Sequence, residues 1–352
     1  MKLSRLLILL AVVLIVVVLL VYAYQSETAP VVATSWQQGP SYPLSVNGVY
    51  AVGGQQCVNE SSYVYCVGGW DVNMAPRDNV YSASLTSSGN LSAWTSDSES
   101  YPVNINGESC IAASGYIFCV GGQYNDQMDD IASSYFAPLA SGQVGGWESS
   151  TAYPIPIDSQ SCVTSSGYIY CVGGSNETDG TNADSALSSS AWYATVSSSG
   201  IGHWNETTPY PPDVYLESCA ASGGYVYCVG GADSGNNAVS TDYYAQLTSA
   251  GIGAWSLTTS YPQQASGQAC ATSAGYIYCV GGLGSPNSYT NAAYYAPVNS
   301  GGVGKWTRAG DYPTGVETAC TIVSGVMYCV GGLNSSSAGM TAETYYAELS
   351  DF

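Results

Sequence analysis

The chain has 352 residues, including 31 Tyr, 41 Gly and 12 Cys, and only 9% of its residues are charged. Five Lys and Arg stand against 25 Asp and Glu, which gives a formal net charge of −20. Nucleic-acid binding needs cationic side chains that displace counterions from phosphates, so this composition argues against it. Attachment to an anionic lipid surface through charge is disfavoured for the same reason.

The N-terminal residues predict a membrane-spanning segment. Residues 6–24 form an uncharged apolar run, close to the roughly 20 residues that a helix needs to cross a bilayer. Lys2 and Arg5 precede this run and favour a cytoplasmic N-terminus. We therefore expect a signal-anchor helix at 1–24, a linker at 25–35 and an extracytoplasmic remainder. The alternative is a secreted protein, whose signal peptide is cleaved after Val21-Tyr22-Ala23.

Asn-x-Ser/Thr sequons agree with export, although they also arise by chance in a chain rich in Ser and Thr. The candidate glycosylation sites are Asn59, Asn90, Asn176, Asn205 and Asn334.

A Gly-Gly pair recurs about every 50 residues, at positions 68, 121, 173, 230, 281 and 331. Each repeat has the same order: Cys, eight residues, Cys-Val-Gly-Gly, a variable loop, an aromatic strand such as YYAQL at 243, a Gly-rich turn, and Trp followed by Tyr-Pro. Such segments predict four short strands per repeat, here called a to d. A period of this length indicates a propeller or a solenoid.

The segment with Trp and Tyr-Pro is out of phase with the repeats. It follows a c strand at Trp94, Trp147, Trp204, Trp255 and Trp306, but Trp36 precedes the first repeat. The last repeat ends at Leu349 with no d strand after it. A ring accounts for this offset, because the N-terminal strand then completes the last blade. We predict an all-β fold, a six-bladed β-propeller spanning residues 36–350.

This pattern resembles the kelch family. The resemblance rests on the apolar run into Gly-Gly, Ile117-Phe118-Cys119-Val120-Gly121-Gly122 and its copies, on the downstream Tyr and on the Trp that ends each unit. It covers nearly all of the predicted exported part. The chain departs from the family in its longer Tyr-to-Trp distance and in its paired cysteines, which are no general kelch feature.

The cysteines fall in pairs nine positions apart: Cys57 and Cys66, Cys110 and Cys119, Cys162 and Cys171, Cys219 and Cys228, Cys270 and Cys279, Cys320 and Cys329. Zinc sites need Cys pairs that converge on one point, usually with His, and this chain has one His. Export favours oxidation, so we predict disulfides. With Ser114-Gly115 as a two-residue turn, Cys110 and Cys119 face each other as a non-hydrogen-bonded pair.

Two candidate sites follow from this architecture. The b–c loops vary between repeats, and variable loops on a rigid scaffold often bind partners. Their candidate ligand face contains Asp71, Asp78, Asp126, Asp129, Asp130, Glu177, Asp179, Asp184, Asp233 and Asp242. No loop has EF-hand spacing, so no cofactor is expected and Ca²⁺ remains only a possibility. The short linker would turn this face away from the membrane.

The second candidate site lies just before strand a, the innermost strand of a blade. Gln or Glu recurs there, at Gln55, Glu108, Gln160, Glu217, Gln268 and Glu317. These side chains could form a ring at the channel mouth and hold a cation or a ligand amine. Alternatively, each could hydrogen-bond the backbone of the neighbouring blade.

No catalytic residues are predicted. Galactose-oxidase-like propellers need two His copper ligands, whereas this chain has only His203, which is expected in a turn. Sialidase-like sites need three Arg, whereas only Arg77 and Arg308 follow the predicted anchor. The favoured function is a cell-surface binding or adhesion module for a protein or glycan partner. A structural envelope component is the alternative, and a carboxylate-dependent glycan-active enzyme is less favoured. Low charge further suggests an acidic exterior.

Overall fold

The computed structural model describes residues 31–32, 36–87, 89–124, 129–176, 186–284, 288–335 and 339–350. Within these ranges the regular secondary structure consists of β-strands, and no helix is long and apolar enough to cross a membrane. The predicted helix at 1–24 lies outside the described residues. The all-β prediction is confirmed, and the many antiparallel sheets are consistent with a β-propeller-like fold.

The larger sheets follow one another along the chain. Sheet 1 contains β5 (Gln56–Glu60), β6 (Tyr63–Val67), β7 (Val80–Ser84) and β8 (Thr95–Ser96). Sheet 2 contains β10 (Ser109–Ala113), β11 (Tyr116–Val120), β14 (Ser134–Ala140), β15 (Gln143–Val144) and β16 (Glu148–Ser149). Sheet 3 contains β17 (Ser161–Ser165), β18 (Tyr168–Val172), β21 (Ala191–Ser197), β22 (Gly200–Ile201) and β23 (Asn205–Glu206).

The second half of the chain repeats this order. Sheet 4 contains β24 (Ser218–Ser222), β25 (Tyr225–Val229), β26 (Asp242–Thr248), β27 (Gly251–Ile252) and β28 (Ser256–Leu257). Sheet 5 contains β29 (Ala269–Ser273), β30 (Tyr276–Val280), β33 (Ala293–Asn299), β34 (Gly302–Val303) and β35 (Thr307–Arg308). Sheet 6 contains β36 (Val316–Val323), β37 (Val326–Asn334) and β38 (Met340–Ser350), joined by β1 (Val31–Val32) and β2 (Gln37–Gln38).

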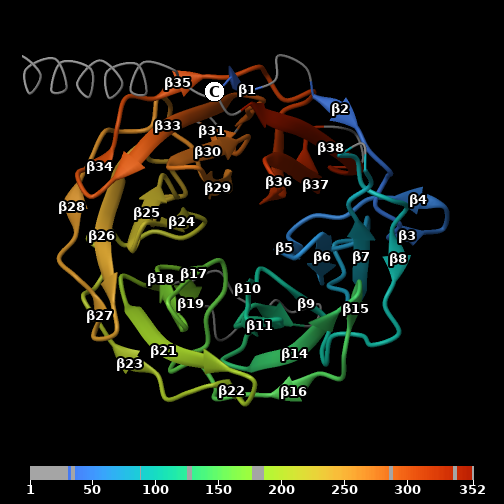
Figure 1. Ribbon diagram of the computed structural model, residues 1–352, viewed down its shortest axis with the longest axis horizontal. Coiled ribbons are helices and arrows are strands. Elements are labelled where there is room, and N and C mark those ends of the chain that lie inside the picture. The colour runs from blue at the N-terminus through green and yellow to red at the C-terminus, as the bar shows by residue number, and fades with distance from the viewer. Residues whose placement is uncertain are drawn as a thin grey trace, which may run out of the picture.

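The sheets stand around a central axis, with the first strand of each sheet innermost (Figure 1). Each first strand contacts the first strand of the next sheet, and β36 contacts β5, so the series returns to its start. The N-terminal β2 pairs with the last strand, Gln37 opposite Tyr346 and Gln38 opposite Tyr345. The N-terminal strand therefore completes the sheet formed by the C-terminal residues, as the offset of the repeats predicts.

The outer strand of sheets 2 to 5 differs from the prediction, because it is divided into two short strands. Between β15 and β16, Gly145 passes so close to the ring of Pro138 that an added Cβ would lie 2.6 Å from Pro138 Cγ. Gly202, Gly253 and Gly304 occupy the same place in the next three sheets. An added Cβ would lie closer than 3.0 Å to a side-chain atom at Gly145, Gly202 and Gly304 and 3.3 Å from the Gln246 carbonyl oxygen at Gly253, and the strand is interrupted at these positions.

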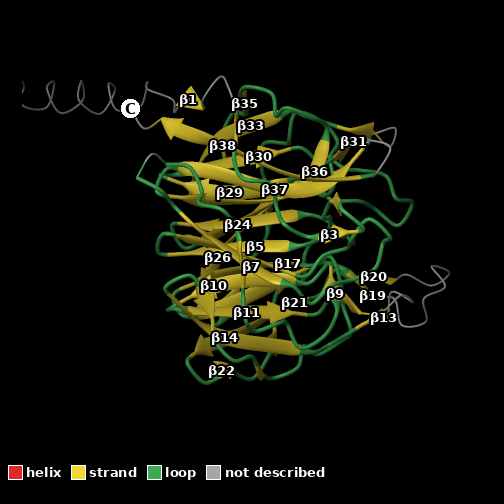
Figure 2. Cartoon of the chain, turned by 90° about the vertical axis from the view of Figure 1, so that its right-hand side faces the viewer, coloured by secondary structure: helices red, strands yellow, loops and turns green. Residues whose placement is uncertain are grey.

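Short hairpins lie together on one side of the ring, as Figure 2 shows for β3, β9, β13, β19, β20 and β31. They are β3 (Ser45–Val46) with β4 (Val49–Tyr50), β9 (Ile105–Asn106) with β12 (Gln123–Tyr124) and β13 (Asp129–Asp130), β19 (Ser175–Asn176) with β20 (Ala186–Leu187), and β31 (Leu283–Gly284) with β32 (Ser288–Tyr289). We call this side the loop face.

The predicted disulfides are confirmed, and every cysteine is paired. Cys110 lies opposite Cys119 in the β10–β11 hairpin, with a Cα–Cα distance of 4.1 Å. Ser114 and Gly115 form the turn at φ of 52° and 79°. Both angles are in the left-handed region that a two-residue type I′ turn requires. The disulfides therefore link the two innermost strands of every large sheet.

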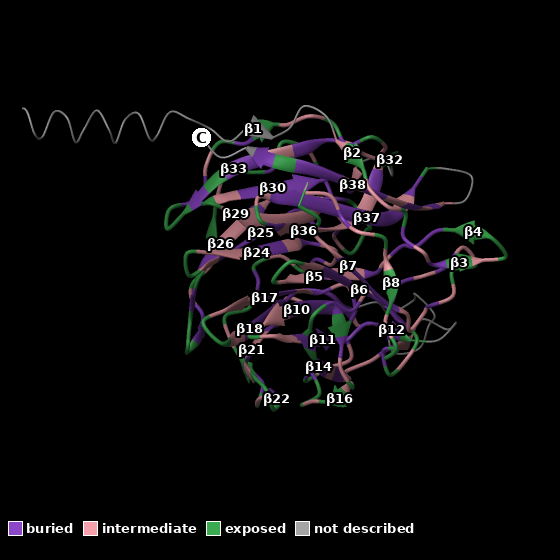
Figure 3. Ribbon diagram, turned by 45° about the vertical axis from the view of Figure 1, so that its right-hand side comes forward, coloured by how far each residue is buried: buried purple, intermediate pink, exposed green. Residues whose placement is uncertain are grey.

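Aromatic side chains fill the spaces between neighbouring sheets. The second strands, such as β30 and β37, are largely buried, whereas the innermost β29 is of intermediate burial throughout (Figure 3). The buried Tyr of each Tyr-Pro pair packs edge-on against two aromatic rings of the following sheet. Tyr101, for example, lies 4.9 Å from Trp147 and 5.4 Å from Tyr135, measured between ring centroids. Such edge-to-face pairs contribute roughly 0.5–1.5 kcal/mol beyond the area that they bury.

A second set of tyrosines joins the sheets through hydroxyl groups. Tyr170 of β18 donates to the carbonyl of Thr248 at 2.8 Å, and Tyr227 of β25 donates to that of Asn299 at 2.9 Å. Each acceptor is the last residue of the c strand in the next sheet. The high Tyr content is thus used mainly between sheets, where a large apolar ring and a polar tip are both needed.

Candidate functional site: the channel mouth

A cavity of about 540 Å³ lies at the loop-face end of the central axis. The first strands of all the large sheets line it, together with loop residues such as Trp70, Tyr215 and Asn236. Its volume falls within the range of ligand pockets, roughly 300–1,000 Å³. No Lys, Arg or His appears among the described residues that line it. A smaller cavity of about 250 Å³, lined by residues such as Asn59 and Val163, lies farther along the same inner strands.

All the residues predicted to ring the channel mouth line this cavity: Gln55, Glu108, Gln160, Glu217, Gln268 and Glu317. The sequence therefore located the ring correctly. The role of its members differs between glutamine and glutamate.

The three glutamines hydrogen-bond the neighbouring sheet, which confirms the second hypothesis for these positions. Gln55 Nε2 donates to the Val330 carbonyl at 2.6 Å. In the same way, Gln160 Nε2 donates to the Val120 carbonyl at 2.7 Å. Gln268 Nε2 donates to the Val229 carbonyl at 2.6 Å. Each acceptor is a second-strand residue of the preceding sheet. These side chains are buried and fasten adjacent sheets at the cavity wall.

A backbone feature directs these side chains between the sheets. The residue before each ring member except Glu317 has a positive φ, from 52° at Ser159 to 67° at Gly54, with 56° at Leu216. Such angles reverse the usual direction of the chain and are uncommon outside glycine. The conformation turns the following Gln or Glu away from the axis and into the space between two sheets.

Glu108 and Glu217 occupy the equivalent positions in sheets 2 and 4, and they are 1% and 5% exposed. Among the described residues, no group donates a side-chain hydrogen bond to their carboxylate oxygens. Burial raises the pKa of Glu108 to about 8 and raises that of Glu217 well above its ordinary value. The Glu108 carboxyl group is therefore mostly protonated at neutral pH, and the shift of Glu217 has the same direction.

Glu317 is placed differently. A register shift between Glu317 and Ala319 disturbs the β36–β37 pairing, so Thr318 stands where the other sheets have Gln or Glu. Thr318 donates to the carbonyl of Val330 within its own sheet at 3.1 Å. Glu317 is only half-buried by its neighbours, and burial raises its pKa to about 7.

Serines form a further set of contacts around the cavity that the sequence analysis missed. Ser109, Ser161 and Ser218 accept hydrogen bonds at 2.9–3.0 Å from the backbone N–H groups of Cys162, Cys219 and Cys270, each in the next sheet. These serines directly precede the first Cys of their own repeats, a signal that aligned repeats contain. They join adjacent inner strands, which lack backbone pairing across the sheet boundary.

The described residues contain no group of three or more His, Cys, Asp or Glu that could hold a metal ion. The three ring glutamates are thus not brought together as a cation site. The loop carboxylates Asp126, Glu177, Asp179 and Asp184, on which a Ca²⁺ site would also depend, lie outside the described residues.

The remaining residues of the predicted ligand face occupy varied environments. Asp71, Asp130 and Asp242 are buried, so the prediction that they present carboxylates to a partner is wrong. Asp71 accepts backbone hydrogen bonds within its loop and pairs with Arg77, and Asp242 accepts a hydrogen bond from Trp306 Nε1 at 3.1 Å. Asp78, Asp129 and Asp233 are half-buried.

The sequons also differ in accessibility. Asn205 in β23 is exposed, Asn90 and Asn176 are half-buried, and Asn59 lies on an inner strand, where its Oδ1 accepts a hydrogen bond from Thr321 at 2.7 Å. Asn334 is 9% exposed within β37. This burial makes Asn334 the least accessible of the predicted glycosylation sites.

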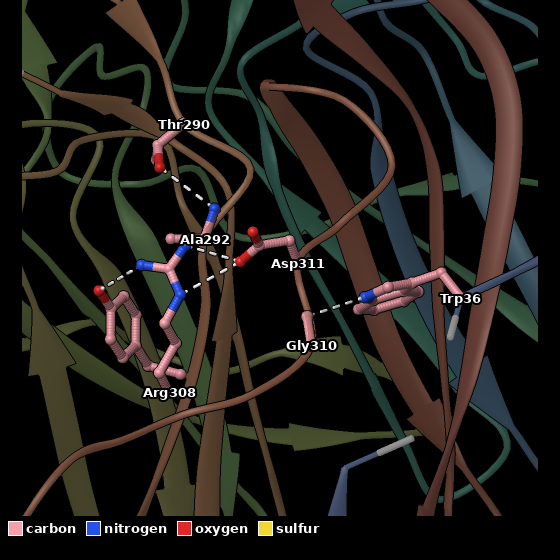
Figure 4. A network of polar contacts seen from close by, with 7 residues as sticks. Trp36, Thr290, Ala292, Arg308, Gly310 and Asp311 are labelled. Carbon is pink, nitrogen blue, oxygen red and sulfur yellow. Dashed lines mark hydrogen bonds and ion pairs between the residues drawn. The ribbon is translucent and has the colours of Figure 1, made fainter. Parts of the chain in front are cut away.

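The remaining polar residues considered for catalysis lie away from the cavity. His203 is exposed in the c–d turn of sheet 3. Arg308 on the outer strand β35 contacts Asp311 at 2.6 Å and the Tyr294 hydroxyl at 3.2 Å, close to Trp36 (Figure 4).

No protein-family model matches the chain, and no curated protein matches it either. Among solved structures, one described as "Structure of YjhT" has a TM-score of 0.68 and 13% sequence identity to this chain, covering 87% of it and 95% of that chain. At this identity the similarity concerns the fold alone.

Proposed function

We propose that the protein is an extracytoplasmic binding or adhesion module, a kelch-like six-bladed β-propeller attached to the cell surface by residues 1–24. Its partner, a protein or glycan, binds on the loop face, and the cavity at the channel mouth receives the part of the partner that inserts. The observation that carries this proposal is the cavity of about 540 Å³, which all the large sheets line together.

The chemistry of the wall favours a polar ligand without negative charge. Amide and hydroxyl groups of accessible lining residues such as Gln56 and Asn236 supply hydrogen bonds, while the ring of Trp70 supplies apolar surface. No described lining residue carries a positive charge that would attract an anion. A neutral glycan terminus meets these requirements better than a carboxylated or phosphorylated one.

A glycan array and a pull-down of surface proteins with the full-length chain test this proposal. Gln56→Trp places a large ring at the cavity wall and should abolish binding, because Gln56 lines the cavity and makes no side-chain hydrogen bond that the fold needs. Glu206→Trp on the exposed outer strand β23 is the matched control and should bind normally. Equal binding by wild type and Gln56→Trp would exclude the cavity as the site.

A further inference from the structure

The space between neighbouring sheets at the cavity wall is filled by an amide in some places and by a carboxyl group in others. A Cβ added at Gly121 would lie 2.8 Å from Gln160 Nε2, and one added at Gly230 would lie 2.7 Å from Gln268 Nε2. Both glycines are the first of a Gly-Gly pair in the preceding sheet. The amide nitrogen thus has a fixed place relative to this pair.

The glutamate oxygens occupy the same place. A Cβ added at Gly68 would lie 2.9 Å from Glu108 Oε1, and one added at Gly173 would meet Glu217 Oε1 first. An oxygen of each glutamate therefore lies where the other sheets put a donor nitrogen. In those sheets the nitrogen donates to the carbonyl of the Val before the Gly-Gly pair, and the corresponding residues here are Val67 and Val172.

Only one protonation state of the glutamates suits this place. An ionised carboxylate has no hydrogen to donate and would set its lone pairs against those of a backbone carbonyl. It would also be a buried charge without a cationic partner, which is costly, and backbone N–H groups offset only part of the effect of burial on the pKa of each glutamate. A protonated carboxyl group provides an O–H donor and has nearly the shape of the glutamine side chain.

We propose that Glu108 and Glu217 act as carboxylic acids that donate hydrogen bonds to Val67 and Val172, so that the channel mouth is fastened in acid and loosens as the pH rises. This inference concerns how the site is regulated and does not depend on which ligand the cavity binds. It gives the protein an acidic working range.

The surroundings of the two carboxyl groups agree with this assignment. Glu108 contributes to the raised pKa values of the Tyr42 and Tyr101 phenols, and Glu217 contributes to those of Tyr153 and Tyr210, so these phenols lie near the carboxyl groups. Burial is the largest cause of the raised pKa of each of these four phenols, so the phenols stay neutral. No Lys or Arg contributes to the pKa of either glutamate.

The direction of the pH effect follows from linkage. The pKa of Glu108 rises from 4.5 to about 8 on folding, so its contribution to stability is complete below pH 4.5 and is lost as the pH rises through 8. Glu217 shifts in the same direction. Between the two pKa values, each group increases the unfolding equilibrium constant by up to about tenfold per pH unit.

Unfolding of the full-length chain in guanidinium, with disulfides intact, tests the proposal between pH 4.5 and 8. Together the two glutamates should raise the unfolding equilibrium constant of wild type by up to about a hundredfold per pH unit. The double variant Glu108→Gln with Glu217→Gln should lack this increase, because glutamine donates at every pH. Asp242 and Glu317, whose pKa values burial also raises, remain in every variant and leave a residual slope. The matched reverse change, Gln160→Glu, should leave acid stability intact and add about tenfold per pH unit.

Infrared spectroscopy gives a second readout that a purely structural role would not change. Wild type at neutral pH should show the carbonyl stretch of buried protonated carboxylic acids, and the double variant should show less of it. A double variant as pH-dependent as wild type would overturn the proposal. A Gln160→Glu variant that loses as much stability in acid as at pH 8 would also overturn the proposal. So would the absence of the carboxylic-acid band from the wild-type spectrum, a measurement that requires no variant to fold. Loss of ligand binding alone would bear only on the proposed function.

Discussion

The indole nitrogen of Trp36 donates a hydrogen bond to the carbonyl of Gly310 at 3.3 Å, across 274 positions of the chain. The Trp36 ring also packs edge-on against Tyr312 at 4.9 Å between centroids. Figure 4 shows Trp36 beside the segment that contains Gly310 and Asp311. This contact joins the N-terminal strand, which belongs to sheet 6, to the end of sheet 5. The edge-on packing of Trp36 repeats that of Trp147 against Tyr101 elsewhere in the ring.

Replacing Trp36 should therefore weaken the closure of the ring. Trp36→Ala removes a half-buried aromatic ring and its hydrogen bond, and we expect a loss of about 3 kcal/mol in the free energy of unfolding. Trp36→Phe keeps the edge-on packing and should lose about 1 kcal/mol. Guanidinium denaturation of both variants measures the difference. Equal stability of wild type and Trp36→Ala would mean that closure does not depend on this side chain.

Hydroxyl groups between the sheets lead to a second prediction. Tyr170→Phe removes the donor to the Thr248 carbonyl while leaving the stacked ring in place, and should cost about 1 kcal/mol. Sheet 2 naturally has Phe118 at this position, which shows that the ring alone can be accommodated. Tyr50→Phe, at an exposed tyrosine of β4, is the control and should change the denaturation midpoint little. A midpoint shift as large at Tyr50 as at Tyr170 would contradict the prediction.

The repeats explain how much of this fold could be predicted. The Cys spacing and the Ser114-Gly115 turn determined the hairpin register, because a two-residue turn leaves one pairing. The displaced Trp36 strand predicted its pairing with the last repeat, since six copies of one unit reveal which part is missing. Both inferences rely on local geometry that is repeated along the chain.

Burial between repeats could not be predicted in the same way. Asp242 looked like a loop carboxylate, but Trp306, 64 positions later, covers it and donates to it. Glu317 matched the Gln and Glu ring in residue type, yet it stands three residues before Cys320 and not two, and Thr318 holds the equivalent position beside the register shift between β36 and β37. The burial of Asp242 depends on a contact between sheets, which the spacing of residue types within one repeat does not encode.

Accessibility of the sequons leads to a third prediction. In a host that glycosylates exported proteins, Asn205 should carry a glycan, because its side chain is exposed on the outer strand β23. Asn334 should remain unmodified, because it is buried within β37. Mass spectrometry of glycopeptides distinguishes the two sites, and Asn205→Gln should remove the corresponding mass. A glycan found at Asn334 would mean that β37 forms differently from the described fold.

Two aspartates in equivalent loops provide a fourth prediction, since they differ chiefly in burial. Asp71 Oδ1 accepts the N–H groups of Asn73 and Ala75, and Asp233 Oδ1 accepts those of Gly235 and Asn237. Asp71 is buried and also pairs with Arg77, whereas Asp233 is only half-buried.

Asp71→Ala should cost about 2–3 kcal/mol, because it leaves Arg77 and two backbone donors without their acceptor, whereas Asp233→Ala should cost much less. Burial alone would raise the pKa of Asp71, but the hydrogen bonds from Arg77, Asn73 and Ala75 outweigh it and lower the pKa. The stabilising effect of Asp71 is therefore present above pH 3.8 and is lost as the pH falls below it. Denaturation of both variants on either side of that pH measures the effect. An equal loss in the two variants, or an Asp71→Ala loss that is as large in strong acid as at neutral pH, would show that Asp71 does not stabilise the loop as an anion.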